Sequence, residues 1–249
     1  MLDSVVSDAQ VAGAESVPAT PKTQVTGIAI LGSNPVTLEA APFGDQNWKI
    51  WACSPDNSPH GHSKHAKALP RVDEWFEVHH PFEDPTRPYS YLRWLEDQDF
   101  ACVWLRDEKV VKRFKTGRLY PERELKGTST LQEIQVPSGA FQQVKNKQGQ
   151  VGFAPIMEKR VTEVPNSDGL FCPYMFTSSI AFMLAKAIVD CEQKGIRQIG
   201  LWGIMQAAKN EWTYQKPGIQ YFLHQAMSRN IKVVANRESC LFDMPDWKW

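Results

Sequence analysis

Glycine and hydroxyl-bearing residues, which suit phosphate binding, occur where an apolar run meets residues that are typical of a helix start. The first such place is the turn made by Gly32, Ser33 and Asn34, which follows the run GIAIL and precedes Pro35. Proline adds no N–H to a strand ladder but fits the first turn of a helix, so this pattern predicts strand, tight turn and helix. Free N–H groups at such a turn attract phosphate. The turn predicts a nucleotide site, with an ordinary strand-to-helix turn as the alternative, because Gly32 is its only glycine.

A second place is the hydroxyl cluster Thr177, Ser178 and Ser179, which opens a helical pattern of apolar residues running to Lys194. One hydroxyl is enough to cap a helix. Three in succession also offer hydroxyls, beside free N–H groups, to an anion. We therefore expect this helix start to bind phosphate or ribose, with simple capping as the alternative.

Polar side chains after two other apolar runs would extend such a site. Asp56 and Asn57 follow the run WKIWAC, where they would bind ribose hydroxyls or, alternatively, cap an Asx turn. His79 ends the run EWFEVH and is a candidate general base, with a structural histidine as the alternative.

A long polar loop follows the run QIGLW. It comes after Gly203 and contains the segment QAAKNEWTYQ, in which Glu211 is a second candidate base and Tyr214 a candidate ligand contact. Long loops at the carboxyl edge of a sheet tend to hold ligands, and a solvated loop is the alternative. The neighbouring histidines His60, His62 and His65 lack an acid or cysteine at ligand spacing, so we expect no metal site there.

The apolar runs that position these residues alternate with helical patterns. Strands are expected at 27–31, 48–53, 74–79, 100–105, 198–202 and 231–235, and helices from Pro35 and at 89–97, 177–194 and 217–230. Such alternation favours a mainly parallel sheet covered on both faces, with the carboxyl ends of its strands at one edge. The sequence predicts an α/β fold, a Rossmann-like three-layer sandwich.

Two segments fall outside this alternation. Residues 1–24 show no sustained period and are expected to form a mobile tail, which leaves residues 25–249 as a single Rossmann-like domain. Residues from about 106 to 165 carry many charges with scattered glycine and proline. They indicate an irregular insertion or cap, with a hairpin around residues 146–149.

Composition argues against several classes of protein. The 249 residues carry 28 basic and 28 acidic side chains, so we do not expect a large basic face for nucleic acid. The five cysteines are widely spaced and odd in number, as expected for reduced residues of a cytoplasmic protein. No apolar stretch has the length of a membrane span, and the first residues lack the regions of a signal peptide.

Two strings of the sequence, GIAILGSNPVT and FTSSIAFMLAKAIVDCEQKGIRQIGLWGI, resemble the Rossmann-like group that contains family 42 sialyltransferases and motility accessory factor proteins. Small proteins of tailed phages and prophages have similar strings, so the resemblance implies a phage or prophage member. The sequence departs from the group's pattern in its first turn, at Ser179 in place of the helix-start glycine, and at Ile204 in place of an acid. The resemblance therefore implies the fold and a nucleotide pocket more directly than it implies glycosyl transfer.

The leading hypothesis is a nucleotide-binding protein, most specifically a glycosyltransferase with a nucleotide-sugar donor. The nucleotide or nucleotide sugar would be a substrate rather than a tightly bound cofactor, and neither a membrane nor nucleic acid is an expected partner. We expect a cytoplasmic location, in the host cytoplasm for a phage-encoded chain. A non-catalytic nucleotide binder or phage accessory protein is the alternative. An NAD-dependent oxidoreductase is disfavoured, because the three-glycine fingerprint and the acid that normally follows it are missing.

Overall fold

The central element of the fold is a seven-stranded parallel sheet with the strand order β5-β4-β3-β2-β1-β8-β9. The computed structural model describes residues 24–79, 88–145, 147–205 and 214–242. The strands of the sheet are β1 (Gly27–Leu31), β2 (Trp48–Ala52), β3 (Glu74–Glu77), β4 (Cys102–Leu105), β5 (Gly117–Leu119), β8 (Gln198–Trp202) and β9 (Lys232–Ala235). The α/β class expected from the sequence is confirmed.

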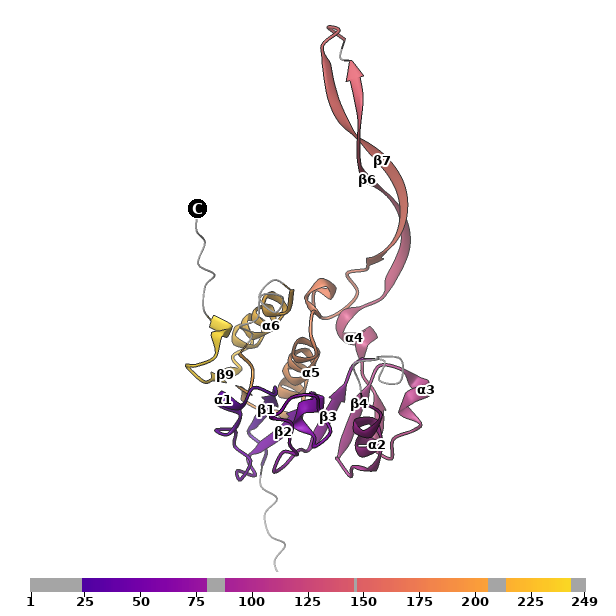
Figure 1. Ribbon diagram of the computed structural model, residues 1–249. Coiled ribbons are helices and arrows are strands. Elements are labelled where there is room, and N and C mark those ends of the chain that lie inside the picture. The colour runs from indigo at the N-terminus through magenta and orange to yellow at the C-terminus, as the bar shows by residue number, and fades with distance from the viewer. Residues whose placement is uncertain (1–23, 80–87, 146, 206–213, 243–249) are drawn as a thin grey trace, which may run out of the picture.

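Helices cover both faces of this sheet (Figure 1). One face packs against α4 (Glu122–Lys126), α5 (Ser179–Lys194) and α6 (Lys216–Ser228). The other packs against α1 (Pro35–Leu38), α2 (Tyr89–Asp97) and α3 (Glu108–Val111). None of the helices in the described ranges combines the length and the apolar character needed to cross a membrane.

Strand β1 shows why its sequence is apolar throughout. Its five residues are all buried, and they alternate between the two faces of the sheet. Ile28 and Ile30 belong to the core under α5 and α6, whereas Ala29 and Leu31 belong to the core on the α1 and α2 side. Because both faces of this strand are buried, neither face carries polar side chains.

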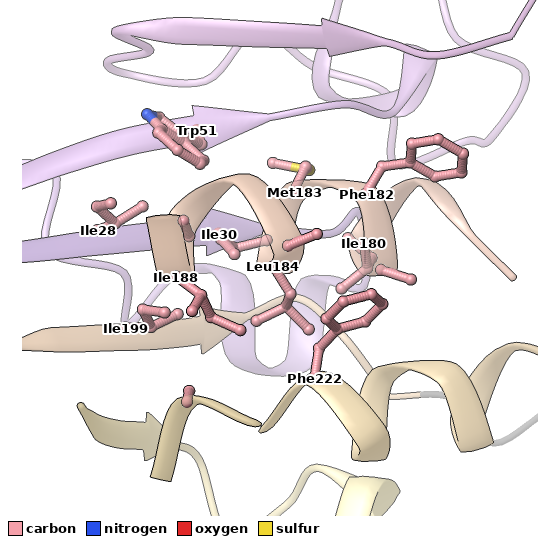
Figure 2. Packing of buried hydrophobic residues seen from close by; sticks show 14 of the residues in the cluster. Ile28, Ile30, Trp51, Ile180, Phe182, Met183, Leu184, Ile188, Ile199 and Phe222 are labelled. Carbon is pink, nitrogen blue, oxygen red and sulfur yellow. The ribbon is translucent and has the colours of Figure 1, made fainter. Parts of the chain in front are cut away.

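Helix α5 is the most deeply buried helix of the fold, with a continuous buried stretch from Ile180 to Cys191. Figure 2 shows its side chains lying between the strands of the sheet and Phe222 of α6. The Ser178 hydroxyl accepts a hydrogen bond from the Ala181 amide at 3.2 Å and caps the helix, and Gly195 ends it in the left-handed conformation. This burial fixes the position of the helix start relative to the sheet edge.

Residues 106–165 do not form one irregular insertion. Their first part belongs to the main fold, because β5 pairs with β4 as an edge strand of the sheet. Their second part is a regular antiparallel ribbon of β6 (Ser129–Lys145) and β7 (Val151–Pro165). Lys145 pairs with Val151, which places the hairpin turn where the sequence predicted it. The ribbon projects away from the sheet rather than capping it (Figure 1).

Candidate functional site

The candidate site lies at the carboxyl ends of β1 and β8. These strands are neighbours, with Leu31 opposite Trp202, but the chain continues from β1 to one side of the sheet and from β8 to the other. In open α/β sheets ligands bind in the crevice at such a switch point. A cavity of about 570 Å³ opens there. Most of the predicted site residues line it, namely Gly32, Ser33, Asn34, Asp56, His79, Thr177, Ser178, Ser179 and Gly203.

Two of the predicted site residues that the structure describes, Asn57 and Tyr214, do not line the cavity. Asn57 is buried behind the first turn, where its side-chain nitrogen donates to the Gly32 carbonyl at 3.2 Å. Its packing inside the fold, rather than at the surface, removes it from contact with a ligand. Tyr214 is 69% exposed and does not line the cavity. Glu211 lies outside the described residues.

The turn after β1 is held to the turn after β8 by backbone hydrogen bonds. The Gly32 amide donates to the Trp202 carbonyl at 2.8 Å, and the Asn34 amide donates to the Gly203 carbonyl at 2.9 Å. The Asn34 side chain accepts from the Val36 amide and caps α1. In the described part of the chain, Ser33 is the turn residue whose amide makes no hydrogen bond. The turn therefore offers a ligand fewer free N–H groups than its sequence suggested.

The three hydroxyls at the start of α5 have different environments. Thr177 donates to the Gln215 carbonyl at 3.2 Å and joins the start of α5 to the start of α6, and Ser178 is the helix cap. The hydroxyl and amide of Ser179 and the amide of Ile180 make no hydrogen bond within the described residues. All of these residues line the cavity. The free groups of Ser179 and Ile180 are thus those able to bind an anion.

Asp56 organises the loop after β2 while lining the cavity. Its Oδ1 accepts from the Ser63 amide at 3.0 Å, and its own amide donates to the Ser54 hydroxyl at 3.3 Å. Ser54 rather than Asp56 is therefore the local cap, and the Asp56 carboxylate holds a residue seven positions further along the loop instead of forming an Asx turn. Ser54, Ser63 and His65 of the same loop also line the cavity and were not among the predicted site residues.

His79 is paired with the buried carboxylate of Glu77, which was not among the predicted site residues. Its Nδ1 lies 3.1 Å from Oε1 of Glu77, whose side chain is fully buried. The other carboxylate oxygen, Oε2, accepts from the Tyr91 hydroxyl at 2.6 Å, and that hydroxyl accepts from the Trp75 indole at 3.1 Å. The sequence could have indicated this pair, because Glu77 and His79 are two residues apart in the strand expected at 74–79. Residues two apart in a strand lie on the same face of the sheet.

Charge in the cavity wall is sparse. Among the described lining residues there is no lysine or arginine, and the ionisable side chains are Asp56, His65 and His79. An anion in this cavity would be held by backbone amides, hydroxyls and imidazoles. In the described ranges no three His, Cys, Asp or Glu side chains are grouped as a metal site.

The cysteines show no disulfide bond. Cys53, Cys102 and Cys191 are buried, and Cys172 and Cys240 are partly buried. Burial raises the pKa of Cys102 to about 12, with a further contribution from the charge of Glu74. Burial likewise raises the pKa of Cys191 to about 12, assisted by Asp190 and Glu192. These two thiols belong to the core rather than to a reactive site.

Comparison of the chain with family models, curated proteins and solved structures found no match.

Proposed function

We propose that the cavity between the ends of β1 and β8 binds a nucleotide through its phosphate groups. The observation that carries this proposal is that the free amides of Ser179 and Ile180, at the start of a 16-residue helix, line the same cavity as His79. Each amide is a hydrogen-bond donor, and the aligned peptide dipoles favour negative charge at this end. The Ser179 hydroxyl adds a third donor beside them.

The remainder of the cavity has the size and polarity for a nucleoside. A volume of about 570 Å³ lies within the usual range of roughly 300–1,000 Å³ for small-molecule sites. Asp56 and Ser54 from the loop after β2, and Ser33 from the first turn, supply acceptors and hydroxyls for sugar hydroxyl groups. The position at the switch point supports the same ligand class.

We further propose that the bound nucleotide is a nucleotide sugar and that the reaction is glycosyl transfer. An acceptor hydroxyl would attack the anomeric carbon, the bond from that carbon to the phosphate oxygen would break, and the nucleotide would leave with the electron pair. The negative charge that develops on the leaving phosphate would be stabilised by the amides at the start of α5. A base is needed to take the proton of the acceptor hydroxyl.

His79 is the proposed base, and Glu77 is the residue that positions it. In the proposed mechanism the Glu77 carboxylate would accept a hydrogen bond from Nδ1 across the 3.1 Å contact, and Nε2 would take the proton of the acceptor hydroxyl. The Tyr91 hydroxyl holds the carboxylate in place from its other oxygen.

A ligand screen tests the binding proposal. Nucleoside monophosphates, nucleoside diphosphates and nucleotide sugars are added to the full chain, and the melting temperature is recorded. A ligand present at a hundred times its Kd stabilises the folded state by about 2.7 kcal/mol, which is a clear upward shift. No shift with any of these ligands would contradict nucleotide binding.

Turnover then separates the enzyme from the alternative. A nucleotide sugar that stabilises the chain is incubated with it and with a mixture of hydroxyl acceptors, and release of the free nucleotide is measured. Release that depends on the acceptor supports glycosyl transfer. Binding with no release supports a non-catalytic nucleotide-binding or phage accessory protein instead.

A further inference from the structure

The ribbon of β6 and β7 is a two-stranded sheet that stands apart from the seven-stranded one. It pairs continuously from Ser129–Pro165 at its base to Lys145–Val151 near its tip, with one irregularity between Pro137 and Phe141. An isolated two-stranded hairpin is only marginally stable in water. A ribbon of this length needs a surface to pack against.

One face of the ribbon carries most of its exposed large apolar side chains. On β7 these are Val151, Phe153, Met157 and Val161, which are separated by even numbers of residues and so point to the same side. Phe141 and Leu131 of β6 lie on this side too, because they pair with Pro155 and Glu163. We call these six residues the apolar face.

The apolar face is open to solvent along its whole length. Phe153 is 75% exposed, Leu131 73% and Phe141 67%. On the opposite face Val136, Ala154 and Val164 are partly buried, and Val144 and Ile156 are each 39% exposed. A standard interface buries about 800 Å² on each partner, and these six large side chains are exposed along one face where a partner could cover them.

The charges on this same face are arranged in a self-complementary way. Glu133 and Glu163 lie near the base, and Lys145 lies near the tip. Lys159 is bonded to Glu133 within the ribbon, at 2.7 Å. If two ribbons run in opposite directions, the acidic base of one faces the basic tip of the other. Met157 would then lie at the centre of the contact between the two ribbons, and Val161 of one ribbon would lie opposite Phe153 of the other.

We propose that the apolar face is a homodimer interface, in which the ribbons of two copies of this chain pack face to face and antiparallel about a two-fold axis near Met157. A two-fold interface uses the same patch on both copies, as the pattern of apolar and charged residues on this face requires. This proposal does not depend on what the cavity binds.

The first test is the mass of the full chain in solution by sedimentation equilibrium. The wild type is expected to be a dimer, and Phe153→Glu is expected to be a monomer of 28.3 kDa. Val144→Glu is the matched control, because Val144 pairs with Gly152 and lies on the opposite face. It should remain dimeric. A wild type that is monomeric at every concentration, or a dimeric Phe153→Glu, overturns the proposal.

The second test addresses the antiparallel arrangement. Lys145→Glu and Glu163→Lys should each weaken the dimer, and the double variant should restore it. Within one ribbon these residues lie at opposite ends, so restoration can only come from contacts between two copies. Near-ultraviolet circular dichroism checks that each variant is folded. A folded double variant that is weaker than both single variants overturns the antiparallel arrangement.

Discussion

The carbonyl oxygen of Gly203 lies 2.3 Å from the point where a β-carbon on Gly32 would stand, and the carbonyl oxygen of Gly32 lies 2.6 Å from the corresponding point on Gly203. The two glycines therefore pack backbone against backbone where β1 and β8 end. Gly203 also has a φ of +68°, which side chains rarely allow. This contact fixes the floor of the cavity.

Alanine at either glycine is expected to destabilise the fold, because the new methyl group would meet a backbone carbonyl of the other turn. We expect each change to lower the free energy of unfolding by roughly 1–3 kcal/mol. The double variant should lose less than the sum, since both changes disturb one contact. Urea denaturation measures the effect.

Gly44→Ala is the control for this experiment, because nothing lies within 4 Å of a β-carbon at Gly44. It should leave stability almost unchanged. If Gly32→Ala and Gly203→Ala were as stable as this control, the close packing of the two turns would be contradicted.

The sequence predicts the centre of this fold well because burial on both faces leaves a strong signal. Strands β1 and β8 have the predicted bounds, and α5 begins at Ser179 with Ser178 as its cap, inside the hydroxyl cluster that was expected to open this helix. The hydrogen bond from the Thr177 hydroxyl to the Gln215 carbonyl, which joins the start of α5 to the start of α6, was not predicted. No local pattern in the sequence reveals a partner 38 residues away.

The edges of the fold are harder to predict from sequence. Strand β5 has three residues, GRL, none of them fully buried, so it carries no apolar run. The ribbon strands contain Pro137 and Pro155, which ordinarily argue against a strand. Gly32 lines the cavity as predicted, but no sequence pattern indicated that the carbonyl group of Gly203 occupies the place where a β-carbon would stand.

The His79–Glu77 pair leads to a prediction about catalysis. His79→Gln should lower kcat by on the order of a hundredfold with little change in nucleotide affinity, because a base acts mainly in the transition state. Glu77→Gln should also lower kcat, since an amide can donate to Nδ1 and hold the wrong tautomer. Steady-state kinetics with the nucleotide sugar found by screening measures both.

His60→Gln is the control for these variants, because His60 is exposed and does not line the cavity. Its kcat should match that of the wild type. Wild-type kcat in both His79→Gln and Glu77→Gln would remove the pair from the mechanism.

The raised pKa values of Cys102 and Cys191 predict a loss of stability at alkaline pH. In the unfolded chain these thiols release their protons near pH 9.0, whereas in the folded protein they keep them up to about 12. Between these values the unfolded state binds fewer protons, so the free energy of unfolding falls as the pH rises. Urea denaturation at several pH values measures the slope.

The slope should be smaller in the double variant Cys102→Ala, Cys191→Ala. Cys172→Ala is the control, because Cys172 is only partly buried. An identical slope in the wild type and the double variant would show that these thiols do not account for the effect.

Phosphate binding at the start of α5 can be tested by a variant that should weaken nucleotide binding without lowering the stability of the fold. Ser179→Asp places a negative charge in the first turn of the helix, where the peptide dipole favours it by about 0.3–1 kcal/mol. The same charge repels a phosphate in the cavity. Ser90→Asp is the matched control, because Ser90 is exposed in the first turn of α2 and does not line the cavity.

The most direct measurement is the affinity of a nucleoside diphosphate, by isothermal titration calorimetry, for the wild type, Ser179→Asp and Ser90→Asp. Nucleotide binding at this cavity predicts equal Kd values for the wild type and Ser90→Asp. It predicts a Kd at least about tenfold higher for Ser179→Asp, equivalent to about 1.4 kcal/mol, in a protein that melts no earlier than the wild type without ligand. No binding by the wild type, or an unchanged Kd in Ser179→Asp, would contradict it.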